Sequence, residues 1–112
     1  MTANNEQVMN LIINAGDAKS SAMEAIYAAK KADFDGAKDK LKEANTKINK
    51  AHNSQTELLT AEANGDHTEI NLLMIHAQDH LMTAITFLEL AQELVDVYEL
   101  TLPKAKSKGN VY

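Results

Sequence analysis

Residues that break helices are scarce in this chain of 112 residues. Pro103 is its one proline, and its four glycines are Gly16, Gly36, Gly65 and Gly109. Because proline and glycine most often end helices, the chain is expected to form a few long helices. A glycine inside a helix costs about 1 kcal/mol relative to alanine, so Gly16 is predicted to mark the close approach of another helix.

Apolar residues recur at three- and four-residue steps through three segments, which is the period of a helix with one buried face. The predicted helices cover about residues 3–31, 33–63 and 68–100. Short turns between helices place neighbouring helices antiparallel. The sequence therefore predicts an all-α domain over residues 1–102, folded as an antiparallel up-down-up three-helix bundle.

Side chains that accept hydrogen bonds stand near the predicted helix starts. Asp33 is the expected N-cap of the second helix, and Asp66 or Thr68 is the expected N-cap of the third. Residues 103–112 are predicted to form a flexible basic tail, because they follow the last periodic segment and contain Lys104, Lys106 and Lys108.

Composition excludes several classes of function. The formal net charge of −5 disfavours non-specific nucleic-acid binding, which needs a basic face. All 11 basic residues are lysines, so a phosphate site cannot use the arginine fork. The absence of cysteine excludes disulfides, thiolate metal sites and cysteine nucleophiles. With no apolar leader and no run of 18 uncharged apolar residues, a cytoplasmic protein is expected.

The third predicted helix carries two apolar stripes. The stripe that a three-helix monomer would bury is Ile70, Leu73, Met74, Ala77, Leu81, Ala84, Ile85 and Leu88. The second stripe is Leu72, Ile75, Asp79, Met82, Thr86 and Leu90. A helix that is apolar most of the way round is usually buried on most sides, so self-association through this helix is predicted.

Asp79 stands singly within the second stripe. In a parallel symmetric assembly its copies would converge near the axis, where they must be protonated, hydrated or bridged by Mg²⁺ or Ca²⁺. The alternative is a carboxylate on the solvated edge of a monomer, and spacing alone does not decide between the two.

The segment with the most chemistry is His76-Ala77-Gln78-Asp79-His80-Leu81-Met82-Thr83. Its two histidines are four residues apart on one helix face. With the intervening carboxylate they suit a transition metal. Alternatively, a neutral imidazole can attack phosphorus while His80, Gln78 or Thr83 donates to the phosphoryl oxygens. Hydrogen-bonded structural histidines are the third interpretation.

Three blocks of the chain stand out together. The first two are Asn14-Ala15-Gly16-Asp17-Ala18-Lys19-Ser20 and Ala51-His52-Asn53-Ser54-Gln55-Thr56-Glu57-Leu58-Leu59, and the latter is followed by Glu62-Ala63-Asn64-Gly65. The third is the histidine segment at residues 76–83. These blocks resemble the IIA proteins of the lactose/cellobiose class of the bacterial sugar phosphotransferase system. The resemblance covers nearly the full length, and the blocks stand in the family's order and spacing.

The resemblance implies a phosphotransferase component that acts through a phosphohistidine. His76 would accept phosphate on Nε2 from the phosphocarrier protein HPr and pass it to the IIB component, which serves the membrane component IIC. His80 and Gln78 would line the phosphoryl pocket. Three copies of the three-helix subunit would form a homotrimer of nine helices, with Asp79 shared between subunits as ligand of a divalent cation, expected to be Mg²⁺, at the axis.

Ala77 favours the cellobiose or chitobiose branch of the family over the lactose branch. The membrane would be reached only through IIC, and no nucleic-acid partner is expected. The rival hypotheses are a non-enzymatic helical metal-binding or scaffolding homotrimer, and a regulatory adaptor whose third helix binds partner helices.

Overall fold

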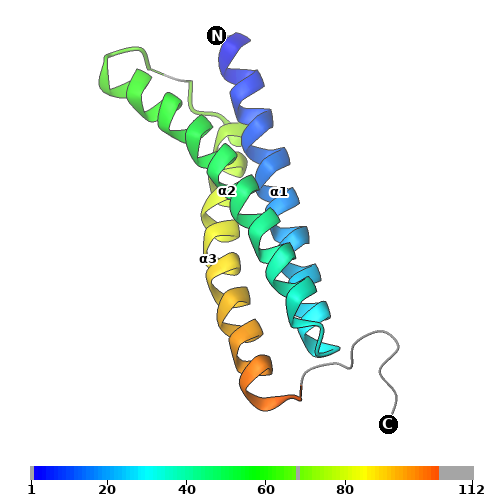
Figure 1. The fold of residues 1–112 in the computed structure, drawn as a ribbon. Coiled ribbons are helices and arrows are strands. Elements are labelled where there is room, and N and C mark those ends of the chain that lie inside the picture. Colours follow the sequence, from blue (N-terminus) through cyan, green and yellow to red (C-terminus); the bar gives the residue numbers. More distant parts are fainter. Residues whose placement is uncertain (1, 68, 104–112) are drawn as a thin grey trace.

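The chain folds into three long α-helices, seen in a computed structural model that describes residues 2–67 and 69–103 (Figure 1). They are α1 (Thr2–Lys30), α2 (Phe34–Ala63) and α3 (Leu72–Thr101). At 1.5 Å per residue each helix is about 45 Å long. α1 and α3 run in the same direction, and α2 runs in the opposite direction (Figure 1). The predicted three-helix bundle is confirmed.

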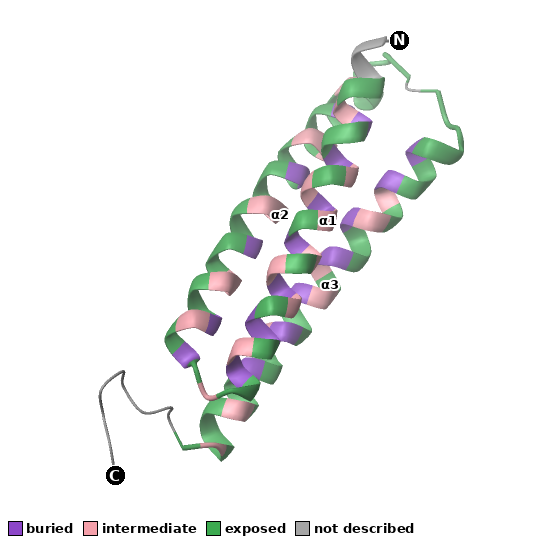
Figure 2. Ribbon diagram, turned by 90° about the vertical axis from the view of Figure 1, so that its right-hand side faces the viewer, coloured by how far each residue is buried: buried purple, intermediate pink, exposed green. Residues whose placement is uncertain are grey.

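Small side chains line the contacts of α1 with the other two helices. Its positions that are at most 1% exposed are Leu11, Ala15, Ala18, Ala22, Ala25 and Ala29. Alanines at these places let the helix axes approach closely. Leu11 packs in one cluster with Leu81 of α3, and Ala29 packs in another with Val95 near the far end of α3. Buried positions consequently face the bundle interior along all three helices (Figure 2).

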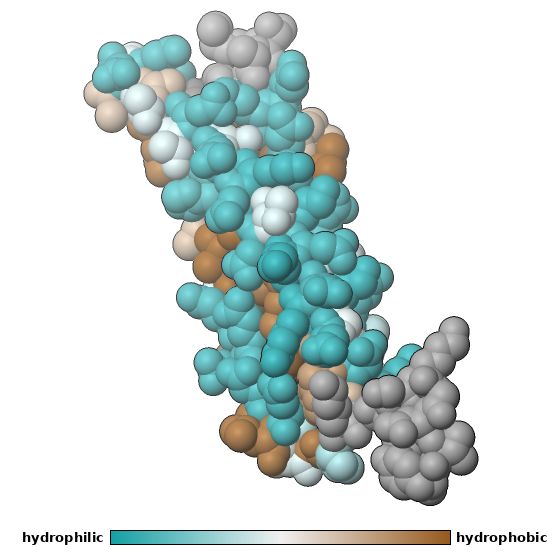
Figure 3. Space-filling model, in the orientation of Figure 1, coloured by the Kyte–Doolittle hydropathy of each residue, from teal (hydrophilic) through white to brown (hydrophobic). Residues whose placement is uncertain are grey.

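The second apolar stripe of α3 is exposed in the single chain. Its apolar members and their exposed fractions are Leu72 81%, Ile75 49%, Met82 53% and Leu90 59%. The face of Figure 3 is mostly hydrophilic, with hydrophobic groups at the side where α3 lies. Apolar stripes of this kind usually mark an interface. No helix in the described part of the chain is long and apolar enough to cross a membrane.

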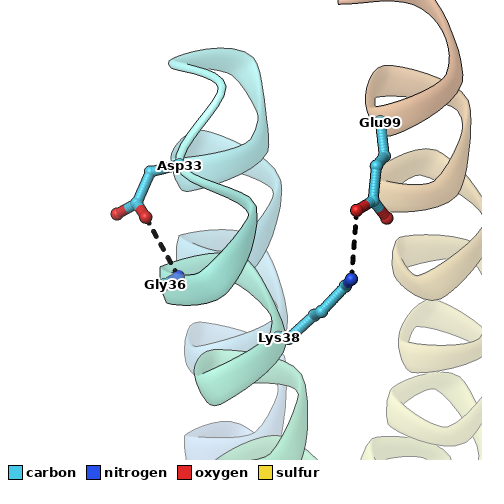
Figure 4. A network of polar contacts seen from close by, with 4 residues as sticks. All are labelled: Asp33, Gly36, Lys38 and Glu99. Atoms are coloured by element: carbon cyan, nitrogen blue, oxygen red, sulfur yellow. Dashed lines mark hydrogen bonds and ion pairs between the residues drawn. The ribbon is translucent and has the colours of Figure 1, made fainter. Parts of the chain in front are cut away.

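The turn between α1 and α2 is closed by the predicted N-cap. The Asp33 carboxylate accepts a hydrogen bond from the Gly36 backbone N–H at 3.0 Å (Figure 4). A Cβ at position 36 would lie 2.3 Å from the Asp33 Oδ2 atom, so a larger residue there would require the Asp33 carboxylate to shift. At the same end of the bundle, Lys38 of α2 forms an ion pair with Glu99 of α3 at 3.0 Å (Figure 4).

The third helix begins at Leu72, four residues beyond the predicted start at residue 68. Gly65 has a φ of +89°, and the Asp66 N–H donates to the Ala61 carbonyl, so Asp66 closes the end of α2 instead of capping α3. The observed N-cap is Asn71, whose side chain accepts from the Met74 N–H at 2.9 Å. The other predicted cap, Thr68, and the tail from residue 104 onward lie outside the described residues.

Candidate functional site

Four residues form a line along one side of α3, at steps of four, three and four residues: His76, His80, Thr83 and Phe87. The two imidazole rings meet edge to face, with their centroids 4.6 Å apart and their planes at 90°. The structure thus brings together the two predicted histidines, and it places them beside α1.

His76 is exposed, and neither of its ring nitrogens has a hydrogen-bond partner among the described residues. Together with Leu72 and Leu73 it lines a shallow apolar pocket of about 510 Å³. An imidazole with an open nitrogen beside an apolar surface meets the first requirement of a nucleophile, which is access to its substrate.

His80 is half-buried and differs from His76 in its surroundings. Burial of the ring lowers the pKa of His80, and the positive charges of Lys19 and His76 lower it further. The neutral form is therefore favoured at neutral pH. Its Nδ1 atom is buried without a hydrogen-bond partner in the described part of the chain. Because a buried N–H without an acceptor is costly, the proton belongs on Nε2, and the ring can donate one hydrogen bond.

A groove runs between α1 and α3 beside His80. It has a volume of about 480 Å³ and is lined by Lys19, Ser20 and Met23 of α1 and by Thr83 and Phe87 of α3. The Thr83 hydroxyl donates to the Asp79 carbonyl oxygen at 2.7 Å, so it is engaged within its own helix. Lys19 is therefore the charged side chain that this groove presents.

Gln78 lies on the other side of α3 from His76. Two residues correspond to about 200° of rotation around a helix, and the Gln78 Oε1 atom accepts a hydrogen bond from Gln55 Nε2 of α2 at 2.7 Å. Gln78 therefore does not join the pocket of His76 in its own chain. The pairing also gives a hydrogen-bond partner to Gln55, a polar residue that stands between the buried Ala51 and Leu58 on α2.

Asp79 is exposed on the second stripe of α3, between Ile75 and Met82. Within the described residues of one chain, no group of three or more His, Asp or Glu side chains is placed to hold a metal ion. The predicted cation site therefore requires carboxylates from several copies of the chain.

Lys19 and Gln55 are the residues that the sequence pattern did not single out as functional. Both lie within the blocks that carry the family resemblance. The available signal was a polar residue set among inward-facing apolar ones: Lys19 follows the buried Ala15 and Ala18, and Gln55 stands between Ala51 and Leu58.

Comparisons with known proteins identify the relatives of this chain. The lichenan-specific phosphotransferase enzyme IIA component of Bacillus subtilis is 49% identical over 92 residues, which are 82% of this chain and 84% of that protein. The crystal structure of a PTS cellobiose-specific enzyme IIA from Bacillus anthracis matches with a TM-score of 0.86 and 48% identity, covering 89% of this chain and 92% of that one.

A third match is the solution structure of the IIA(Chitobiose)–HPr complex of the Escherichia coli phosphotransferase system. Its TM-score is 0.76 at 39% identity, and it covers 87% of this chain and 94% of that one. The profile of the family described as "PTS system, Lactose/Cellobiose specific IIA subunit" matches residues 6–99. The chain therefore belongs to the lactose/cellobiose-specific IIA subunits of the phosphotransferase system, and it is a phosphotransferase component.

Proposed function

We propose that this chain carries a phosphoryl group on His76, taking it from HPr and passing it to the IIB component. The observation that carries the proposal is the exposed His76 ring with open nitrogens beside the neutral His80 ring. A relative of this family has been solved in complex with HPr, which supports HPr as the donor. The reaction takes place in the cytoplasm, where the partner proteins meet.

In the proposed step, the Nε2 lone pair of neutral His76 attacks the phosphorus of the donor's phosphoryl group. A phosphorus–nitrogen bond forms as the bond to the donor breaks, and the electron pair of that bond stays with the donor. The Nε2–H of His80 donates to a phosphoryl oxygen as charge builds up there. Transfer to IIB is the same displacement with His76 as the leaving group.

The proposal includes assembly into a homotrimer through the second stripe of α3. The exposed Leu72, Ile75, Met82 and Leu90 supply the apolar surface for this contact. Around a threefold axis, the side of α3 that faces α1 in one copy meets the side that faces α2 in the next. The Gln78 amide of one copy then approaches His76 of its neighbour. Gln55 holds the Gln78 oxygen, and the Gln78 NH₂ group donates one hydrogen to Met74 Sδ at 3.9 Å, which leaves its second hydrogen for the neighbouring site.

Asp79 would hold a divalent cation at the axis of the trimer. Three carboxylates provide oxygen ligands, which Mg²⁺ and Ca²⁺ prefer, and the exposed position of Asp79 on the interface stripe fits this donor set. The cation would supply charge that offsets the repulsion between the three carboxylates. The phosphoryl transfer itself is assigned to the histidines.

The proposed pathway serves a β-linked disaccharide of the cellobiose or chitobiose class, which IIC transports and IIB phosphorylates. The names of the relatives described above support this class, since they refer to lichenan, cellobiose and chitobiose. Ala77 supports the same branch.

The test is mass spectrometry after incubation with phosphoenolpyruvate and the general phosphotransferase proteins. Wild type should gain about 80 Da, the mass of one phosphoryl group, in an acid-labile adduct. His76→Ala should gain nothing, whereas His52→Ala, which changes an exposed histidine of α2, should be phosphorylated normally. Unmodified wild type would refute the proposal and favour a metal-binding or scaffolding trimer.

A further inference from the structure

Phosphorylation of His76 creates a charge problem for this chain. A phosphoryl group brings about two negative charges, and the protein is already acidic and contains no arginine. Phosphoryl sites usually include a cation that offsets this charge. The second histidine does not fill that role in the resting protein, because burial and neighbouring positive charge favour its neutral form.

Lys19 differs from the other half-buried lysines of the described residues in that it has no ion-pair partner. Among the residues that the structure describes, three lysines are half-buried: Lys19, Lys40 and Lys47. Lys40 pairs with Glu24 and Glu43 at 3.1 Å each, and Lys47 pairs with Asp17 at 3.6 Å. Lys19 forms no ion pair with any residue that the structure describes. A partly buried cation without an anion suggests that its anion comes from outside the chain.

The position of Lys19 directs its charge toward the histidines. It lines the groove between α1 and α3, opposite Thr83 and Phe87, and those two residues continue the line of His76 and His80 along α3. Side chains of a helix lean toward its N-terminus. Figure 1 shows that α1 and α3 run in the same direction. By this rule the Lys19 side chain leans from the level of Thr83 toward that of His80, whose pKa the Lys19 charge lowers.

We propose that Lys19 is the cation of the phosphoryl site, donating hydrogen bonds from its ammonium group to the phosphoryl oxygens on His76. Lys19 keeps its three protons and forms no covalent bond, while the new bond joins phosphorus to His76 Nε2. This inference rests on the proposed function, and it adds a residue from α1 to a site otherwise built from α3. It also identifies a cation that can bind the phosphoryl oxygens in a chain that contains no arginine.

The experiment compares Lys19→Met, Lys19→Arg and Lys40→Met. The last is a matched control, because it removes the same charge from another half-buried lysine. Two quantities are measured with HPr: the rate of phosphoryl transfer and the equilibrium ratio of the two phosphorylated proteins. Lys19→Met should lower both by about tenfold, the scale of one partly screened charge-assisted contact. Lys19→Arg should restore most of the loss, and Lys40→Met should change neither quantity.

A second measurement does not depend on phosphoryl transfer. Because the Lys19 charge lowers the pKa of His80, removing it should raise that pKa in an NMR titration of unphosphorylated Lys19→Met, and Lys19→Arg should leave it low. An unchanged His80 titration, or transfer by Lys19→Met that equals wild type, would overturn the Lys19 assignment alone. Wild type that takes no phosphate would instead overturn the proposed function.

Discussion

The imidazoles of His76 and His80 touch edge to face, 4.6 Å between centroids, yet one is exposed and the other half-buried. One turn of helix therefore separates a ring that partners can reach from a ring that the protein keeps neutral. The two roles follow from the surroundings of the rings, because His80 is half-buried near the charge of Lys19, whereas His76 is exposed beside Leu72 and Leu73.

The stability of the protein should depend on pH through His80. Its pKa is lowered in the folded state below the usual value near 6.5. As pH falls below about 6.5, the unfolded chain takes up a proton at this residue before the folded chain does. His80 therefore contributes a loss of stability that grows from about pH 6.5 downward and is complete below its folded-state pKa. Urea unfolding of wild type and His80→Gln at pH 7.5 and 5.5 measures this.

His80→Gln should lose less stability than wild type over that interval. His52→Gln is the control, because it removes a histidine that is exposed on α2. Equal losses in wild type and His80→Gln would contradict the assignment of a neutral His80.

Asp79→Leu should stabilise the assembly. If copies of α3 meet through the stripe of Ile75, Asp79 and Met82, three carboxylates lie together, and well-packed apolar side chains are favoured over clustered buried charges. Sedimentation at micromolar concentration with EDTA present should show a trimer that persists to lower concentration than wild type. Asp39→Leu, at an exposed position of α2, should leave the association unchanged.

Dissociation of Asp79→Leu in EDTA would show that the Asp79 carboxylate holds the copies together. A wild-type monomer under the same conditions would contradict the trimer.

The helices of this protein were predictable because their determinants are local. The spacing of Leu11, Ala15, Ala18 and Ala22 defines the buried side of α1, and Asp33 caps α2 by a contact with a residue only three positions away. The start of α3 was placed too early because three residues in that connection have capping side chains. Asp66 closes the end of α2, which depends on the φ of Gly65, and the observed cap of α3 is the later Asn71.

The site was only partly predictable because it joins residues from different helices. His76 and His80 come from one helix, so their spacing was sufficient. Lys19 becomes part of the site only when α1 packs beside α3, and Gln78 faces Gln55 of α2 instead of His76. Adjacency in sequence placed Gln78 beside His76 in the prediction, whereas the helix turn places them on opposite sides.

Gln78 should therefore act on the His76 of a neighbouring copy. When each variant is assayed alone, His76→Ala cannot accept phosphate. Gln78→Ala should accept it about tenfold more slowly than wild type, because one neutral hydrogen-bond donor is lost. When the two variants are unfolded together and refolded, mixed trimers contain some intact His76–Gln78 pairs, so transfer onto Gln78→Ala subunits should accelerate. Mass spectrometry distinguishes the two chains.

A mixture in which Gln78→Ala subunits react at their original slow rate would contradict a shared site. Refolding Gln78→Ala with His76→Ala/Gln78→Ala is the control, because no intact pair can form in that mixture.

Gly16→Ala should stabilise the isolated chain. The predicted close approach of another helix is wrong within the described residues, because a Cβ at position 16 would meet nothing within 4 Å. Alanine in the interior of a helix is favoured over glycine by about 1 kcal/mol, which corresponds to a rise in Tm of roughly 5 °C for a domain of this size. Gly65→Ala is the contrasting variant, because its φ of +89° strains any side chain and should lower Tm. Thermal unfolding followed by circular dichroism measures both, and a lower Tm for Gly16→Ala would mean that a neighbouring copy occupies the open space beside Gly16.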